Sequence, residues 1–369
     1  MSLKHDVTSP QGSRVLVVTF RLDTWLLFIS RALSRMAYDV TIITHTADSP
    51  DDPDHNDILK YFRAHPFCRM ADFQETSSLP VANYDFAVTG LRGISSPEEK
   101  SQLLATMGDA RLLAVVLRHY NLEYPAMSRL VIKEMLSPFI RRAPRVLVED
   151  YGQAAWLLRL LATPIEMGVI PHQRVICQGW TENQPDQAER PFLFNFLGTH
   201  SGPPGATLIE PRAQILDDLE ALLQISAGGD QKVTLNGKTA RIMWHADRPN
   251  TMRTRPLNEY LDTLCGSRFT LCLPGHTVIT HRVLEALHCG SIPVMAAEIV
   301  SHYDLPLIHG RTCWLVKNAD WKSVPAALLA LDRDKVLEMQ SAVKKLAHGE
   351  ASIPALERRA IKNLGLIPA

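Results

Sequence analysis

The sequence has no excess of charge of either sign. Its 369 residues contain 39 Lys and Arg and 39 Asp and Glu, so the formal net charge is zero. A protein that binds nucleic acid or anionic membranes over a broad surface carries a basic excess, which is absent here. Only a local basic pocket is compatible with these numbers. Apolar residues make up 46% and charged residues 21% of the chain, as in soluble globular proteins.

Paired cysteines and long apolar runs are also missing. The six cysteines form no Cys-x-x-Cys motif: Cys68, Cys177, Cys265, Cys272, Cys289 and Cys313. Their scatter argues against a zinc site or a disulfide framework and favours a reduced chain. The first apolar run, residues 15–20, is too short for a signal peptide or a membrane span. We therefore expect a cytoplasmic protein without a transmembrane segment.

The beginning of the chain predicts a doubly wound α/β domain. Residues 14–20 form a continuous β-branched run, typical of a buried parallel strand, residues 25–36 have helical apolar spacing, and residues 39–44 resemble a second strand. Such a β-α-β opening predicts a parallel sheet covered by helices. The Gly-x-Gly-x-x-Gly of dinucleotide oxidoreductases does not follow the first strand, which disfavours that class.

The length of 369 residues predicts two domains. We expect a first domain over residues 1–180, with further strands at 86–89, 112–116, 146–149 and 174–177 and helices at 124–141 and 153–161. A polar linker is expected at 181–190. Residues 191–345 alternate strands (192–197, 240–245, 268–273, 292–295) with helices (212–224, 256–264, 280–289), which predicts a second parallel domain. Residues 346–369 are expected to pack back on the first domain.

The most informative stretch is residues 267–294, SRFTLCLPGHTVITHRVLEALHCGSIPV. It predicts a strand, a Pro-Gly turn, a helix and a second strand. A glycine-containing loop that leads into a helix presents backbone N–H groups and the positive dipole end to an anion. Arg282 adds a bidentate phosphate donor. Glu285, three residues on, can accept from a ribose diol. This combination indicates a site for a nucleotide-diphosphate sugar.

This stretch resembles the exostosin-like glycosyltransferases. The family pattern is a Gly, a Ser or Thr, an Arg two residues later, Glu-Ala, then a small residue or Cys and Pro-Val. In this sequence the corresponding residues are Gly275, Thr280, Arg282, Glu285-Ala286, Cys289-Gly290 and Ile292-Pro293-Val294. Two flanking segments agree, namely 192–198 followed by Arg212, and 304–307 with Trp314, although Leu307 stands where Phe is usual. The resemblance covers roughly residues 192–331, and the N-terminal half matches only in organisation.

The resemblance implies a GT-B fold, with two Rossmann-like doubly wound α/β domains facing across a cleft. The first domain would bind the acceptor and the second the donor. It further implies inverting transfer from a nucleotide sugar, a UDP-sugar, to a saccharide or other hydroxyl acceptor in glycan or polysaccharide biosynthesis, with no additional cofactor. Animal members of the family have an N-terminal membrane anchor, and this chain shows no such run, so we expect a cytoplasmic form.

Other functions are compatible with the same motif. One is a catalytically idle nucleotide-binding or scaffold partner of another glycosyltransferase. Others are a transferase that acts on a small molecule or a nucleobase, and a nucleotide-sugar epimerase of the same shape. Donor turnover without an acceptor would mark the epimerase.

Five residues are expected to hold the donor. Arg282 would bind the diphosphate and act catalytically by stabilising the departing nucleotide, and Glu285 would hold the ribose. Thr280 is either a plain helix N-cap or a cap that also donates to phosphate. Gly198 and Arg212 enclose a Gly-rich loop that either approaches the diphosphate or is only a turn followed by a surface charge.

Further candidates surround this set. Gly275 and His276 stand at the tip of the loop before the helix, where His276 either contacts phosphate or sugar or is a surface residue. His200 is a candidate contact to the donor sugar. Residues 244–247 (Trp-His-Ala-Asp), at a strand end, are candidates for the uracil or ribose site.

The catalytic base should follow a strand of the first domain. In order, the candidates are Asp150, Asp23 and Glu123, each of which could equally be a helix cap or a surface charge.

Two literal Asp-x-Asp patterns, residues 52–54 and 332–334, could suggest the metal site of a GT-A transferase. The first lies in a polar stretch that we expect to be a loop, and the second lies at an expected helix start. We therefore predict that no metal is required.

Overall fold

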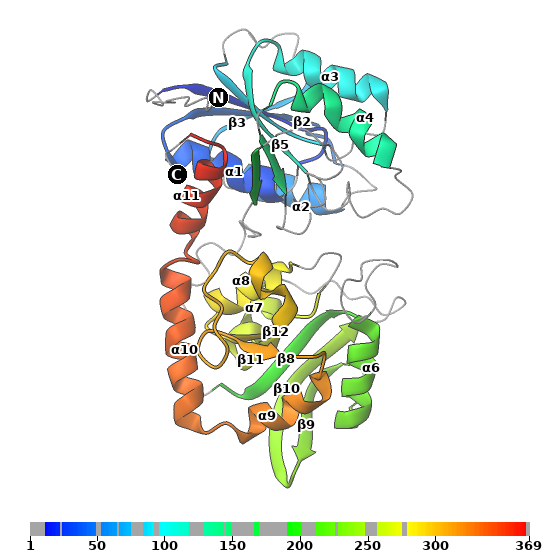
Figure 1. The fold of residues 1–369 in the computed structure, drawn as a ribbon, viewed down its shortest axis with the longest axis vertical. Helices are drawn as coiled ribbons and strands as arrows, with labels where there is room; N and C mark the ends of the chain where they lie inside the picture. Colours follow the sequence, from blue (N-terminus) through cyan, green and yellow to red (C-terminus); the bar gives the residue numbers. More distant parts are fainter. Residues whose placement is uncertain are drawn as a thin grey trace. The chain divides into compact units, whose positions relative to one another are not determined.

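The computed structural model describes most of the chain (Figure 1). The described residues are 12–22, 24–48, 53–64, 66–74, 84–91, 96–117, 129–143, 145–148, 166–169, 190–200, 212–225, 228–247, 257–274 and 279–366. The chain forms two compact units, Met1–Ile176 with Pro354–Ala369, and Cys177–Ile353. Among the described helices, none combines the length and the apolar character that crossing a membrane requires.

The first unit contains a seven-stranded parallel sheet. Its strands are β1 (Arg14–Val18), β2 (Asp39–Thr44), β3 (Arg69–Asp72), β4 (Phe86–Gly90), β5 (Arg111–Val116), β6 (Arg145–Val148) and β7 (Glu166–Val169), in the order β3-β2-β1-β4-β5-β6-β7. This is the strand order of the doubly wound fold, which confirms the expectation from the β-α-β opening. The expected strands at 86–89, 112–116 and 146–149 are present as β4, β5 and β6.

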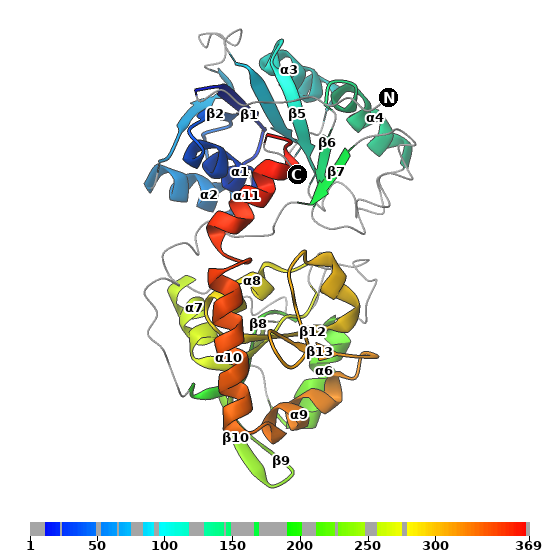
Figure 2. The ribbon, with the colours of Figure 1, turned by 60° about the vertical axis from the view of Figure 1, so that its left-hand side comes forward.

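Helices cover both faces of this sheet. Helices α3 (Pro97–Met107) and α4 (Arg129–Ile140) lie on one face, and α1 (Thr24–Arg35), α2 (Pro53–Ala64) and α11 (Ile353–Asn363) lie on the other (Figures 1 and 2). Strand β1 is fully buried from Val15 to Val18, because a parallel strand has helices on both sides. The expected helix at 153–161 and strand at 174–177 lie outside the described residues, and β7 was not predicted.

The C-terminal helix is fixed to the first helix by a buried ion pair. Glu357 of α11 is 6% exposed. It accepts from Arg31 Nε at 3.1 Å and from Arg35 Nη1 at 3.1 Å. A buried carboxylate is tolerated only when cations pair with it, so these contacts hold α11 against α1.

The second unit contains a six-stranded sheet in the order β13-β12-β11-β8-β10-β9. Its strands are β8 (Phe192–Thr199), β9 (Gly229–Leu235), β10 (Lys238–Asp247), β11 (Ser267–Leu271), β12 (Ile292–Ala296) and β13 (Trp314–Val316), and its helices are α6 (Arg212–Leu223), α7 (Leu257–Cys265), α8 (His281–His288), α9 (Val324–Ala330) and α10 (Arg333–His348). All strand pairs are parallel except β9–β10. The expectation of an entirely parallel domain was therefore wrong at this edge. Asn236 and Gly237, with φ of 51° and 74°, form the tight turn of a hairpin.

The strand order of the second sheet reverses at β8. After β8, the chain forms β9 and β10 on one side of β8, and it then continues with β11 on the other side of β8. In open α/β sheets, ligands bind at the carboxyl ends of the strands where the order reverses. The end of β8 and the segment between β11 and α8 are therefore the expected ligand position.

The expected linker at 181–190 does not extend to its last residue. Arg190 is 6% exposed and donates to three main-chain carbonyls, those of Leu264 at 3.2 Å, Ser267 at 3.0 Å and Cys289 at 2.8 Å. Its guanidinium thus satisfies carbonyl groups at the end of α7, at the start of β11 and at the C-cap of α8. Arg190 belongs to the core of the second unit.

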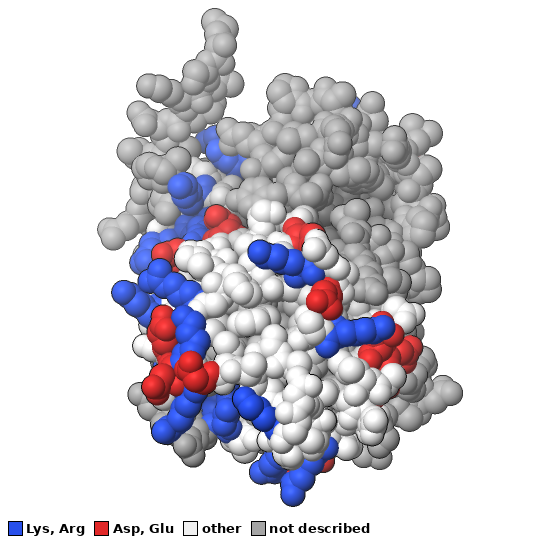
Figure 3. All heavy atoms as spheres, turned by 60° about the horizontal axis from the view of Figure 1, so that its bottom comes forward, with Lys and Arg blue, Asp and Glu red and all other residues white. Residues whose placement is uncertain are grey.

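Surface charge is mixed on the face drawn in Figure 3, where basic and acidic side chains lie next to one another. Among the described residues, side chains of opposite charge also form ion pairs, such as Lys322 with Asp218 at 3.1 Å and Lys335 with Glu338 at 2.9 Å. No broad basic field covers this face, in keeping with the zero net charge.

Candidate nucleotide-sugar site

Helix α8 begins at a well-fixed N-cap. The Oγ1 of Thr280 accepts from the backbone N–H of Arg282 at 3.3 Å, as predicted for a cap. The backbone of Thr280 is also held by Tyr303, whose hydroxyl accepts from Thr280 N at 2.7 Å and donates to Thr280 O at 3.3 Å. The cap role is confirmed, and a contact between Thr280 and phosphate stays a prediction.

Arg282 is buried although it carries a charge. It is 8% exposed, its Nη2 donates to Leu197 O at 2.6 Å, and its Cζ lies 5.2 Å above the Phe196 ring. Its Nε is buried and has no hydrogen-bond partner among the described residues. The first turn of α8 therefore brings this guanidinium to the carboxyl end of β8.

Gly198 makes room for this guanidinium. A Cβ built at Gly198 would lie 2.7 Å from Arg282 Nη2, closer than real Cβ contacts allow. Gly198 lies within β8 and not in a turn, so the reading of this glycine as a simple turn residue was wrong. The absence of a side chain at Gly198 allows a charged group to approach the strand closely.

Arg212 brings a second guanidinium to the same strand end. It opens α6 and is half-buried, and its Nη1 donates to Thr199 O at 3.2 Å and to Thr199 Oγ1 at 3.3 Å. Burial and the positive charge of Arg282 lower the pKa of Arg212 to about 10. Arg212 is therefore not the surface charge of the alternative interpretation.

The two guanidinium groups lack a carboxylate partner within the described part of the chain, where neither forms an ion pair. Two like charges that are partly removed from water destabilise one another unless an anion binds between them. A diphosphate can accept from both forks at once and supplies the missing negative charge.

Glu285 lies one turn further along α8 and is 1% exposed. Tyr260 of α7 donates its hydroxyl to Glu285 Oε2 at 2.5 Å, and His281 Nε2 lies 3.8 Å from the same oxygen. Cys272 directly follows β11, and burial raises the pKa of its thiol to about 12. The charges of Arg282 and Glu285 also act on this thiol, so both side chains lie near the end of β11. Tyr260 was missed, because a tyrosine within a helix pattern gives no signal of its partner.

The structure describes only some of the remaining residues that were predicted to contact the donor. His200 is 6% exposed and its Nε2 lies 2.8 Å from Asp217 Oδ1. Trp244 is fully buried and donates from Nε1 to Glu220 Oε1 at 2.9 Å. The role of residues 244–247 at the uracil or ribose stays a prediction. Gly275 and His276 lie outside the described residues.

The candidate bases Asp150, Asp23 and Glu123 also lie outside the described residues, so their roles stay predictions.

The described part of the first Asp-x-Asp pattern lies in a helix. Pro53 is the first residue of α2, so the expected loop is helical from residue 53 onward, as the preference of Pro for this position explains. Asp52 lies outside the described residues. Asp332 caps α10 by accepting from Lys335 N at 2.7 Å, as predicted.

Part of this chain is similar in sequence to known glycosyltransferases. The family model of the Exostosin GT47 domain matches residues 143–307. Ribitol-5-phosphate xylosyltransferase 1 of mouse is 27% identical over 199 residues, which are 50% of this chain and 39% of the relative. The human protein of the same name is 29% identical over 170 residues, which are 42% of this chain and 33% of the relative. The matched segments thus span well under half of these relatives.

Solved structures show the fold alone, because sequence identity to them is low. An Anabaena HepE complex with UDP-glucose covers 96% of this chain and 100% of its own, with a TM-score of 0.54 and 12% identity. A TarM variant of S. aureus, in complex with Fondaparinux, α-GlcNAc-glycerol and UDP, covers 95% of this chain and 99% of its own, with a TM-score of 0.60 and 9% identity. Both agree with the two α/β units, and the fold is GT-B.

The family match also includes the strand β8, the helix α8 and the residues between them that form the cationic site. Residues 143–307 of this chain are thus similar to the Exostosin GT47 domain of glycosyltransferases.

Proposed function

We propose that this protein transfers a sugar from a UDP-sugar to a hydroxyl group with inversion of the anomeric configuration. The observation that carries the proposal is the pair of guanidinium groups, Arg282 and Arg212, that meet at the end of β8 without a carboxylate partner among the described residues. The similarity of residues 143–307 to the Exostosin GT47 domain supports a nucleotide sugar as the anion that such a pair would bind.

Arg282 is the residue that would act on the reaction. As the bond from the anomeric carbon to the diphosphate breaks, negative charge grows on the departing phosphate. A cation that is already fixed, here by Leu197 O and by the Phe196 ring, stabilises that charge without reorganisation. Arg212 would share the diphosphate, and Glu285, held by Tyr260, would accept from the ribose hydroxyls.

The acceptor hydroxyl would attack from the face opposite the departing UDP and lose its proton to a base. Asp150 and Asp23 are our first candidates for this base, ahead of Glu123. The names of the two relatives suggest UDP-xylose and ribitol 5-phosphate as the first donor and acceptor to test. Since the matched segments are short relative to those proteins, other UDP-sugars and saccharide acceptors belong in the same screen.

The test is a transfer assay with the full chain in EDTA. UDP-xylose, UDP-glucose and UDP-GlcNAc are each incubated with ribitol 5-phosphate or with saccharide acceptors, and released UDP and the product are measured. We expect acceptor-dependent UDP release and a product of inverted configuration by NMR. Retained configuration would refute inversion, and release that needs no acceptor would favour an epimerase or a hydrolase.

The second candidate is an idle nucleotide-binding partner of another glycosyltransferase. It predicts UDP binding without turnover of any sugar in the screen. The intact pair Arg282 and Glu285 favours an active enzyme, because an idle partner has no need of a leaving-group cation.

A further inference from the structure

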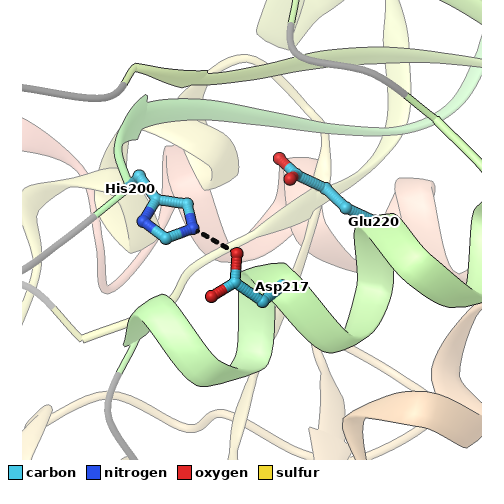
Figure 4. A group of neighbouring side chains, drawn as sticks. All are labelled: His200, Asp217 and Glu220. Atoms are coloured by element: carbon cyan, nitrogen blue, oxygen red, sulfur yellow. Dashed lines mark hydrogen bonds and ion pairs between the residues drawn. The ribbon is translucent and has the colours of Figure 1, made fainter. Parts of the chain in front are cut away.

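A second cluster of ionisable side chains lies beside the candidate donor site. His200 follows the last residue of β8, and Asp217 and Glu220 lie one turn apart on α6, so both carboxylates face the imidazole (Figure 4). One ligand atom from each of the three residues can be chosen so that all lie within 4.8 Å of one another. No step of the proposed sugar transfer uses this cluster.

The side chains are held in place from two directions. His200 is 6% exposed, its backbone N–H donates to Asp247 O at 2.8 Å, and its Nε2 lies 2.8 Å from Asp217 Oδ1. Glu220 is oriented by the buried indole of Trp244, which donates to its Oε1 at 2.9 Å. Such a hydrogen bond to a carboxylate is typical of the shell that orients metal ligands.

The cluster brings two carboxylates and one imidazole together. A divalent ion would neutralise both carboxylates and bind the neutral imidazole. Asp217 has a side chain that is 51% exposed, which gives an ion access from solvent.

We propose that His200, Asp217 and Glu220 form a binding site for a divalent transition-metal ion. An imidazole nitrogen with two carboxylate oxygens is a ligand set suited to Zn²⁺ or Mn²⁺, whereas Mg²⁺ and Ca²⁺ prefer oxygen ligands alone. Two donors of one ion lie at most about 4.2 Å apart, given metal–ligand distances of about 2.1 Å. A small rotation of the half-exposed Asp217 side chain would satisfy this limit.

The site is distinct from the two Asp-x-Asp patterns considered in the sequence. It also does not contradict the prediction that transfer requires no metal, because the proposal concerns binding. The sequence alone did not predict this cluster, because His200 and Asp217 are separated in the chain and come together only when α6 packs beside β8.

The test uses the full chain stripped with EDTA and then freed of the chelator. Zn²⁺ and Mn²⁺ are titrated by calorimetry, and bound metal is counted by elemental analysis. Asp217→Asn and His200→Gln remove one ligand each with little change of volume. Asp218→Asn is the matched control, because Asp218 is the next residue on α6 and pairs with Lys322 outside the cluster.

We expect one ion per chain in the parent protein and in Asp218→Asn. Loss of a ligand should weaken metal binding at least about 10-fold. Removal of a residue that only hydrogen-bonds a metal ligand already has an effect of this size. The absence of saturable binding, or equal affinity in Asp217→Asn and the parent, would overturn the proposal. A thermal melt in EDTA shows whether His200→Gln is folded. If this variant is unfolded, the metal affinity of Asp217→Asn alone tests the proposal. UDP binding measured in EDTA on the same samples tests the donor site separately.

Discussion

The two sheets of this protein have the same kind of reversal in strand order but different chemistry at that point. In the second unit, the end of β8 meets the guanidinium groups of Arg282 and Arg212. In the first unit, the ends of β1 and β4 carry hydroxyl groups that bond to main-chain carbonyls, Thr19 to Arg21 O at 2.9 Å and Thr89 to Val18 O at 3.0 Å. The first reversal point thus carries hydroxyl groups that are bonded to main-chain carbonyls, and the second carries two guanidinium groups.

Each reversal point contains a glycine, Gly90 in the first unit and Gly198 in the second, and the two glycines have different neighbours. A Cβ at Gly90 would collide with the side chain of Leu26, so this glycine allows α1 to pack on the sheet. A Cβ at Gly198 would instead meet the tip of Arg282, so this glycine allows a charged group to reach the strand. The same topology thus accommodates an apolar side chain in one unit and a guanidinium in the other.

The largest effect is expected from Arg282→Ala. Loss of a fixed cation at the leaving group should lower kcat by about 100- to 1000-fold, the range seen when one preorganised transition-state donor is removed. Steady-state kinetics on the best donor of the screen gives the number. Arg282→Lys, which keeps the charge without the fork, should recover part of the rate. Full activity of the alanine variant would refute the catalytic assignment.

Gly198→Ala and Gly90→Ala test the contrast between the two glycines. Displacement of Arg282 by the new methyl group should weaken UDP binding by about 1.5–3 kcal/mol, the value of a hydrogen bond to a charged group. The unfolding free energy should change little, because the tip of a flexible side chain can move. Gly90→Ala should keep UDP affinity and lose about 1–3 kcal/mol of stability from overpacking. Calorimetry and denaturant unfolding separate the two outcomes, and the reverse pattern would contradict this account.

Glu285→Ala should weaken UDP binding by about 1.5–3 kcal/mol, the value of a hydrogen bond to a charged group. If the carboxylate accepts from the ribose diol, the variant should lose much less affinity for 2′-deoxy-UDP than for UDP. Competition binding with both nucleotides measures the difference. An equal loss for the two would assign Glu285 to the fold and not to the ribose.

The smallest effect is expected from Tyr260→Phe. Removal of the hydroxyl that donates to Glu285 Oε2 should cost about 0.5–1.5 kcal/mol in UDP affinity, as for a single hydrogen bond. The loss should disappear in the background of Glu285→Ala, because the hydroxyl acts through that carboxylate. Additive losses in the double variant would show that Tyr260 acts independently.

Sequence patterns predicted the elements that carry the site. The run before Pro274, the cap Thr280 and the apolar spacing of α8 are local signals, and they placed Arg282 and Glu285 correctly on α8. The partners of these residues were not predicted, because Leu197 O and Tyr260 approach α8 only through the packing of β8 and α7. The hairpin β9–β10 had a signal in Asn236-Gly237 that went unused in favour of the general alternation of strands and helices.

The central claim is that the end of β8 binds a diphosphate through two arginines. Calorimetric titration of UDP and of uridine into the parent protein, Arg282→Gln and Arg212→Gln, all in EDTA, tests it most directly. We predict that the parent binds UDP far more tightly than uridine and that each variant loses most of this difference. Equal affinity of the parent for UDP and uridine, or an unchanged difference in both variants, would contradict the claim.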